Sequence, residues 1–193
     1  MKGRIHLVLG GARSGKSTYA EQMAMALSND VLYIATAVIT DDDMADRIER
    51  HKASRPSNWH TLEQYSTFEN LVSLEAFSDS EVVLLDCLTV MMTNLMFASD
   101  IDFEDTTPSA IGDVEASIKR EIDELIKAIR LVDKHLVIVS NEVGLGIVPA
   151  YKLGSYFRDI SGRMNQYVAK LADDVTFIAS GLPLVLKKGA EHD

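Results

Sequence analysis

A glycine-rich segment follows the first apolar run of the chain and fits the pattern G-x-x-x-x-G-K-[ST]: Gly10-Gly11-Ala12-Arg13-Ser14-Gly15-Lys16-Ser17. Glycines permit a tight loop whose backbone N–H groups point inward at phosphate, and the lysine can reach the β and γ phosphates. The serine hydroxyl can ligate Mg²⁺. A chance glycine-rich turn is the alternative, but the loop lies between an apolar strand-like run and a helix-like stretch, which is the context such a site requires. The sequence therefore predicts a site for a nucleoside triphosphate with magnesium.

An acidic residue, Asp86, ends the apolar run 82–85. A metal-bound triphosphate usually needs a carboxylate at the end of a neighbouring strand. The alternative is an acid that simply ends a strand. With the glycine-rich loop present, we predict that Ser17 and Asp86 are the magnesium ligands.

Five apolar runs of strand length alternate with stretches long enough for helices, which predicts a mostly parallel sheet with helices on both faces. The expected strands are residues 5–9, 31–35, 82–85, 136–139 and 175–179, with 182–186 as a short final, antiparallel strand. The expected helices are 16–27, 41–53, 66–74, 114–129 and 156–171, where 66–74 opens with a capping box formed by Ser66 and Glu69. Residues 99–113 are polar, acidic and contain Pro108, so they are expected to form a surface loop.

Composition limits the class of protein. The 193 residues, with 47% apolar and 25% charged side chains, suit one catalytic, nucleotide-binding domain over 1–193. The single cysteine, Cys87, cannot form an internal disulfide, no secretory leader opens the chain, and no apolar run reaches the roughly 20 residues of a membrane span. We therefore expect a cytoplasmic protein. A net charge of −10 argues against nucleic acid as a partner.

His51 lies in a cationic stretch, Arg47-Ile48-Glu49-Arg50-His51-Lys52-Ala53-Ser54-Arg55-Pro56, near the end of the expected helix 41–53. A neutral imidazole can attack phosphorus to give a phosphoramidate, and nearby cations can hold the phosphates. The alternative is a solvated histidine at the negative end of a helix dipole, which the local pattern alone favours.

Four other residues have an ordinary interpretation beside a functional one. Trp59 could stack on a base, but we expect it to pack in the core. Glu63 could bond a ribose or guanine edge, and Glu142 follows a strand end where ligands often bind; either could equally be an ordinary surface acid. Cys87 is expected to be a small buried residue beside Asp86.

Taken together, the segments resemble the bifunctional adenosylcobinamide kinase and adenosylcobinamide-phosphate guanylyltransferase family of cobalamin biosynthesis across nearly the whole chain. The resemblance rests on an ordered set of motifs: the loop 10–17, Tyr33-Ile34-Ala35-Thr36, Arg47-Ile48, His51, Arg55-Pro56, Trp59, Thr93-Asn94-Leu95, Asn141-Glu142-Val143-Gly144, Gly146-Ile147-Val148-Pro149, Phe157-Arg158-Asp159-Ile160, Gly162-Arg163 and Asn165-Gln166.

This resemblance implies phosphorylation of the aminopropanol hydroxyl of adenosylcobinamide, followed by transfer of GMP from GTP onto that phosphate. It implies that His51 is the GMP-linked nucleophile, which reverses the interpretation of His51 as a solvated helix-end histidine that the local pattern favours. It also implies that Lys16 serves phosphoryl transfer. The implied nucleotide contacts are Gly10, Gly11, Ala12, Arg13, Ser14, Gly15, Lys16, Ser17, Ala35, Thr36, Ala37, Lys52, Ala53, Ser54, Arg55, Glu63 and Asp86. The implied cofactor is Mg²⁺, and GTP is a substrate, with ATP also open for the kinase step.

The family also implies a three-layer P-loop NTPase fold, a RecA-like sheet with an antiparallel edge strand, and a homotrimer that binds adenosylcobinamide and adenosylcobinamide phosphate. Two positions depart from relatives: Arg50 stands where some carry a second histidine, and Asp86 where others carry Glu.

Two other functions stay open, a P-loop small-molecule kinase without nucleotidyl transfer and a nucleotide-switched binding module. The sequence lacks the Asn-Lys-x-Asp motif by which regulatory GTPases read the base.

Overall fold

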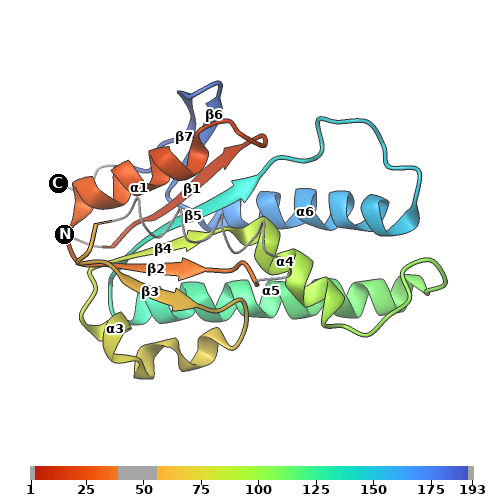
Figure 1. Cartoon of the computed structure of the whole chain (residues 1–193), viewed down its shortest axis with the longest axis horizontal. Helices are drawn as coiled ribbons and strands as arrows, with labels where there is room; N and C mark the ends of the chain where they lie inside the picture. Colours follow the sequence, from red (N-terminus) through yellow and green to blue (C-terminus); the bar gives the residue numbers. More distant parts are fainter. Residues whose placement is uncertain (1–2, 39–55, 191–193) are drawn as a thin grey trace.

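The computed structural model describes residues 3–38 and 56–190, which contain a seven-stranded sheet in the order β3-β2-β4-β5-β1-β6-β7 (Figure 1). All neighbouring strands run parallel except β6 and β7, which are antiparallel. The predicted mostly parallel sheet with an antiparallel edge strand is therefore confirmed. The strands are β1 (Ile5–Gly10), β2 (Val31–Ala35), β3 (His60–Glu63), β4 (Val82–Asp86), β5 (His135–Asn141), β6 (Asp174–Ala179) and β7 (Leu182–Lys187).

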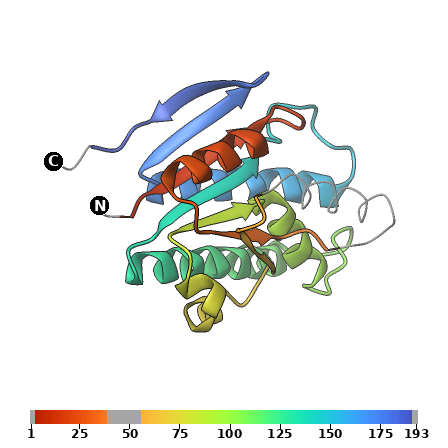
Figure 2. The ribbon, with the colours of Figure 1, turned by 60° about the vertical axis from the view of Figure 1, so that its left-hand side comes forward.

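Helices cover both faces of this sheet (Figure 2). Successive strand side chains point to opposite faces, so Leu7 joins the larger core with α4, α5 and α6, whereas Val8 packs with Ala20 and Ala24 of α1. The predicted three-layer arrangement is confirmed. The helices are α1 (Lys16–Leu27), the 3₁₀ helix η1 (Phe68–Ser73), α3 (Glu75–Ser78), α4 (Leu88–Phe97), α5 (Pro108–Leu131) and α6 (Lys152–Leu171). Among the described residues, no helix is both long and apolar enough to cross a membrane.

Two predictions of local structure were wrong. The expected loop 99–113 ends early, because α5 begins at Pro108 with Thr107 as its N-cap, whose hydroxyl accepts a hydrogen bond from the N–H of Ala110 at 3.3 Å. Proline suits the first helical position, since the N–H it lacks would have no partner there. The expected capping box at Ser66 does not form either. Thr67, at φ 62°, precedes η1 without a side-chain cap, so the segment is a short 3₁₀ helix rather than a helix over 66–74.

Of two further helix predictions, one is confirmed with a different start and the other cannot be compared with the structure. The last helix ends at Leu171 as expected but begins four residues earlier than Tyr156, at Lys152. The predicted helix 41–53 lies outside the described residues, together with His51 and the segment Lys52, Ala53, Ser54 and Arg55.

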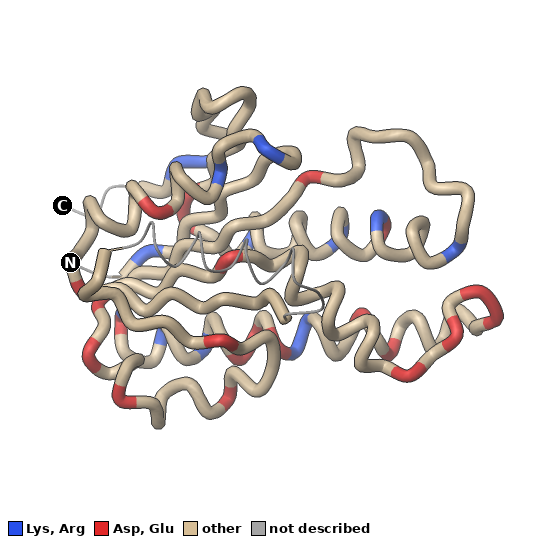
Figure 3. The backbone as a smooth tube through the Cα atoms, viewed as in Figure 1, with Lys and Arg blue, Asp and Glu red and all other residues tan. Residues whose placement is uncertain are grey.

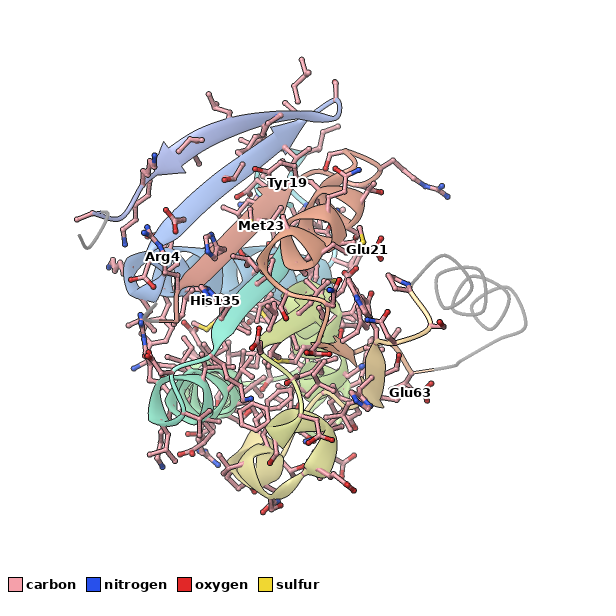
Figure 4. The ribbon with its side chains drawn as sticks, turned by 90° about the vertical axis from the view of Figure 1, so that its left-hand side faces the viewer. Arg4, Tyr19, Glu21, Met23, Glu63 and His135 are labelled. Atoms are coloured by element: carbon pink, nitrogen blue, oxygen red, sulfur yellow. The ribbon has the colours of Figure 1, made fainter. Side chains whose placement is uncertain are left out.

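Charged side chains fasten the amino-terminal edge of the sheet, where Figure 4 shows Arg4 and His135. Arg4 binds both carboxylate oxygens of Asp174 at 3.0 Å, which ties the start of β1 to the start of β6. The neighbouring Asp173 accepts a bond from the N–H of Ile5 at 2.8 Å and pairs with Arg130 of α5 at 3.2 Å. This edge is opposite the carboxyl ends of the parallel strands. Its ion pairs and hydrogen bonds therefore stabilise the sheet away from the edge where ligands of such sheets bind.

Ile129 and Leu131 offer a test of this packing, because they lie two residues apart on α5 but are 1% and 73% exposed. Replacing Ile129 by alanine leaves a cavity in the core and should lower the free energy of unfolding by about 2–4 kcal/mol. Leu131→Ala, the matched control, should change it by less than about 0.5 kcal/mol. Urea unfolding followed by circular dichroism measures both, and equal losses would contradict the packing.

Candidate active site

Three neighbouring parallel strands end at the same edge of the sheet, with Asp86 on β4, Asn141 on β5 and Gly10 on β1. Gly10 is the register partner of Asn141, and Ala35 at the end of β2 is the partner of Asp86. Adjacent strands lie about 4.8 Å apart, so roughly 10 Å separate the ends of β1 and β4. Ligands of open α/β sheets bind beyond such carboxyl ends, and the chain brings the glycine-rich loop and its expected acid to this edge.

The loop 10–17 is shaped by close backbone contacts. A Cβ at Gly10 would lie 2.5 Å from Ser14 Oγ and 2.8 Å from the carbonyl oxygen of Ile178, so only glycine fits. Gly15 has φ 92°, a conformation that glycine adopts without strain. The loop closes on itself through a bond from the N–H of Ser14 to the carbonyl of Gly11 at 3.2 Å.

A turn from the opposite end of the chain supports this loop. The N–H of Gly181, between β6 and β7, donates to the carbonyl of Ser14 at 2.8 Å. A Cβ at Gly15 would approach the Cα of Gly181 to 3.5 Å. This contact could not be predicted from the sequence, because nothing near Gly181 resembles a nucleotide motif.

The first turn of α1 suits an anion. Gly15 occupies the N-cap, no side chain caps the helix, and no acid lies in its first turn. The N–H groups and the positive end of the helix dipole therefore face the loop. Lys16 is 8% exposed, and its Nζ donates to the carbonyl of Gly11 at 3.1 Å, which keeps the ammonium group inside the loop.

Asp86 is oriented by a tyrosine for which the sequence predicted no role. The hydroxyl of Tyr33, on the neighbouring strand β2, donates to Asp86 Oδ2 at 2.9 Å. The Tyr33 ring stacks on Trp59 with centroids 6.4 Å apart, and Trp59 is 8% exposed. The prediction that Trp59 packs in the core is thus confirmed. One carboxylate oxygen of Asp86 is engaged by Tyr33, so the carboxylate is held in a defined direction.

Thr36 and Cys87 join the ends of β2 and β4. The Thr36 hydroxyl donates to the carbonyl of Cys87 at 2.8 Å and accepts from its N–H at 2.9 Å, while the Asn94 amide donates to the carbonyl of Thr36 at 2.7 Å. Thr36 is 1% exposed, so its side chain points into the protein. Cys87 is buried as predicted. Burial, and then the adjacent Asp86 carboxylate, raise the pKa of its thiol to about 11, so the thiol is protonated near neutral pH.

A buried polar cluster lies behind the same edge. Thr89 of α4, Ser140 of β5 and Asn165 of α6 are at most 5% exposed. The Ser140 hydroxyl lies 3.2 Å from that of Thr89 and donates to Asn165 Oδ1 at 2.7 Å. The Thr89 hydroxyl also accepts from the N–H of Asn141 at 2.7 Å, and Asn165 donates to the carbonyl of Asn141 at 3.0 Å. These bonds fix two helices to the strand end beside the loop.

The remaining predicted residues are placed as follows. Ser17 is half-buried in the first turn of α1, and Ala12 and Arg13 are exposed in the loop. Glu63 is exposed at the end of the edge strand β3 (Figure 4). The Glu142 carboxylate accepts from the N–H of Gly144 at 2.8 Å, within its own loop. Ala35 is buried and Ala37 half-buried beyond β2.

A magnesium ion fits this donor set. Ser17 and Asp86 provide a hydroxyl and a carboxylate oxygen, the hard ligands that Mg²⁺ prefers, and α1 packs against β4. Mg²⁺ usually takes only one or two protein ligands and completes its shell with phosphates and water. Residues 3–38 and 56–190 hold no group of three or more His, Cys, Asp or Glu side chains that could bind a metal ion by themselves.

Comparisons with known proteins match one enzyme family over most of the chain. The family model described as cobinamide kinase / cobinamide phosphate guanyltransferase matches residues 6–186. The bifunctional adenosylcobalamin biosynthesis protein CobU of Escherichia coli is 44% identical over 183 residues, which are 94% of this chain and 98% of that protein. CobP of Pseudomonas aeruginosa, a protein of the same description, is 38% identical over 94% of this chain and 96% of its own length. Among solved structures, the flagellar accessory protein FlaH of Methanocaldococcus jannaschii aligns over 97% of this chain and 80% of its own, with a TM-score of 0.48 and 15% identity.

The contacts of the loop predict different outcomes at two adjacent glycines. Gly10→Ala forces a methyl group against the Ile178 carbonyl and should lower the free energy of unfolding by about 1–3 kcal/mol. Gly11→Ala is the control, since a Cβ there meets nothing within 4 Å. Its stability should stay within about 0.5 kcal/mol of the parent in the same denaturant titration. Equal stability of the two variants would be inconsistent with the loop geometry.

Proposed function

This chain belongs to the cobinamide kinase / cobinamide phosphate guanyltransferase family, and we propose that it carries out both reactions at one nucleotide site. In the first, it phosphorylates the aminopropanol hydroxyl of adenosylcobinamide with a nucleoside triphosphate. In the second, it transfers GMP from GTP through a histidine-linked intermediate and gives adenosylcobinamide-GDP. The observation that carries this proposal is the loop 10–17, which curves around the Lys16 ammonium group at the carboxyl edge of the sheet.

In the kinase step, the substrate hydroxyl oxygen bonds to the γ phosphorus and the bond from that phosphorus to the β–γ bridging oxygen breaks. The nucleoside diphosphate leaves, and the hydroxyl proton is released to solvent. Backbone N–H groups of the loop and Lys16 hold the phosphates and offset the charge that develops on them. Ser17 and Asp86 are the proposed ligands of Mg²⁺, which neutralises phosphate charge when bound. Tyr33 keeps the Asp86 carboxylate in position for this task.

In the nucleotidyl step, an imidazole nitrogen of His51 bonds to the α phosphorus of GTP and pyrophosphate leaves. A phosphate oxygen of adenosylcobinamide phosphate then bonds to the same phosphorus, and the P–N bond breaks to regenerate the histidine. His51 lies outside the described residues, and its role rests on the family resemblance. The chain does leave β2 at the carboxyl edge, since Ala35 pairs with Asp86, and this is the edge where the loop lies.

The proposed nucleotide contacts are the loop 10–17, the residues 35–37, the segment 52–55, Glu63 and Asp86. In the structure the Thr36 side chain is turned inward, and its N–H donates to the carbonyl of Asp86 at 3.2 Å. From the family resemblance we also propose that residues 1–193 form one catalytic domain, that GTP is used with ATP open for the kinase step, and that the enzyme is a cytoplasmic homotrimer.

The covalent intermediate can be tested directly. Incubation with α-labelled GTP and Mg²⁺ should leave label on the protein that is labile in acid and stable in alkali, as a phosphoramidate is. His51→Ala should remove it, whereas His60→Ala, at an exposed position on β3, should retain it. Absence of label in the parent protein, under conditions that support phosphorylation of adenosylcobinamide, would reject the nucleotidyl transfer and leave only the kinase reaction.

Substitution of Lys16 tests its proposed role in phosphoryl transfer. Lys16→Ala should reduce kinase turnover by about 10³-fold, because the ammonium group no longer stabilises charge on the transferred phosphoryl group. Lys127→Ala is the control, since that side chain is 73% exposed on α5. Turnover is measured as adenosylcobinamide phosphate formed per minute at saturating nucleotide. Near-normal turnover of Lys16→Ala would refute the assignment of the loop.

A further inference from the structure

Two adjoining hollows lie between the end of α4 and the start of α6. Their volumes are about 260 and 190 Å³, and they share the lining residues Met96, Phe97, Tyr151 and Leu153. Thr93 and Phe157 complete the second hollow, while Asp102 and Glu104 line the first. The two hollows therefore form one continuous and mainly apolar depression, which we call the α4–α6 hollow.

The walls of the α4–α6 hollow are fastened to each other. The Glu104 carboxylate accepts from the N–H of Leu153 at 3.3 Å, and the Lys152 ammonium group donates to the Glu104 carbonyl at 2.5 Å. The rings of Phe103 and Tyr156 lie 6.4 Å apart. These contacts tie the loop before α5 to the first turns of α6, so the hollow exists before a ligand arrives.

Large apolar side chains around the hollow face outward. Phe97 is 66% exposed and Tyr151 is 61% exposed. Such a concentration of exposed apolar side chains typically marks a binding surface. Ligand sites of small molecules share this character, with a mostly apolar lining and a few polar groups.

The hollow is connected to the phosphate site by α4. This helix begins two residues after Asp86, has ten residues and rises about 1.5 Å per residue, so Phe97 lies roughly 14 Å beyond its start. Thr93 lies about halfway along. A ligand that reaches from the loop 10–17 into the hollow must be large and must carry its reactive hydroxyl on an extended arm.

We propose that the α4–α6 hollow binds the corrin ring system of the acceptor substrate, a point that rests on the proposed function. A corrin ring is broad and edged with methyl groups, and in cobinamide the aminopropanol arm extends from its periphery. The hollow receives the apolar edge of the ring while the arm reaches along α4 to the nucleotide.

Charge supports the same occupant. Adenosylcobinamide carries one net positive charge, because a trivalent cobalt is bound by a corrin monoanion and one carbanionic adenosyl ligand. The loop beside the hollow carries four acids and no basic residue between Asp100 and Asp105 (Figure 3). An acidic rim favours a cationic ring and disfavours an anionic nucleotide.

Substitutions at the rim test the apolar contact. Phe97→Ser and Tyr151→Ala change exposed side chains, and each should raise the KM for adenosylcobinamide about tenfold. The kcat and the Kd for GTP should stay near those of the parent. Leu131→Ser is the matched control, since that side chain is 73% exposed at the far end of α5.

A second measurement tests the charge. Asp102→Asn removes a negative charge but keeps an oxygen that can accept the bond from the N–H of Glu104. In equilibrium dialysis at low salt it should weaken binding of cationic adenosylcobinamide about threefold. Binding of dicyanocobinamide, which has no net charge, should not change.

The proposal is overturned if both rim variants keep the parent KM, or if size-exclusion chromatography shows that they alter the oligomeric state instead, which would make the hollow a contact between copies. Failure of the proposed function has a different signature. The parent protein would then transfer no phosphate to adenosylcobinamide at any concentration, whatever the rim variants do.

Discussion

The site depends on one close approach of backbone to backbone, where β1 passes the carbonyl of Ile178 with no room for a side chain at Gly10. This contact lets the chain turn directly from a buried strand into the loop and brings Lys16 back over the Gly11 carbonyl. The positions of the N–H groups that are proposed to hold phosphate are thus set by the packing of the sheet itself. Side chains then refine the site, as Tyr33 does for Asp86. The shape of the proposed triphosphate site is therefore fixed by the central strands of the sheet, independently of the catalytic side chains.

Sequence patterns predicted six of the seven described strands and the loop because both signals are local: a run of apolar residues, or glycines at fixed spacing before a lysine. Strand β3 was not predicted, since it is mostly exposed and has no such apolar run. The start of α5 was mispredicted because Pro108 was interpreted as a helix breaker although proline suits a first turn. The polar contacts of the site were not predictable in this way. Tyr33 and Asp86 are 53 residues apart, and Thr89 and Ser140 are 51 apart, so only the strand order brings them together. The role of His51 could be inferred only from the family resemblance.

Helix α4 links two kinds of recognition in the molecule. Its first turn follows Asp86 and is bonded to β5 through Thr89, whereas its last turn carries Met96 and Phe97 at the α4–α6 hollow. In the proposed function, backbone groups that do not distinguish among nucleotides hold the phosphates. The hollow instead offers apolar surface and acids suited to a bulky cation. Selectivity for the acceptor can therefore reside in a part of the fold that the triphosphate does not touch.

The turn at Gly181 connects the loop 10–17 by a hydrogen bond to the least buried strand of the sheet, β7. Every residue of β7 is exposed, and within the described residues β7 is an edge strand paired only with β6. Elements with few buried contacts open at lower free energy than the core. When β7 separates from β6, the loop loses the bond that Gly181 donates to Ser14 while β6 stays paired with β1. On heating, the protein should therefore pass through a folded but catalytically silent form, so that inactivation occurs at a lower temperature than unfolding.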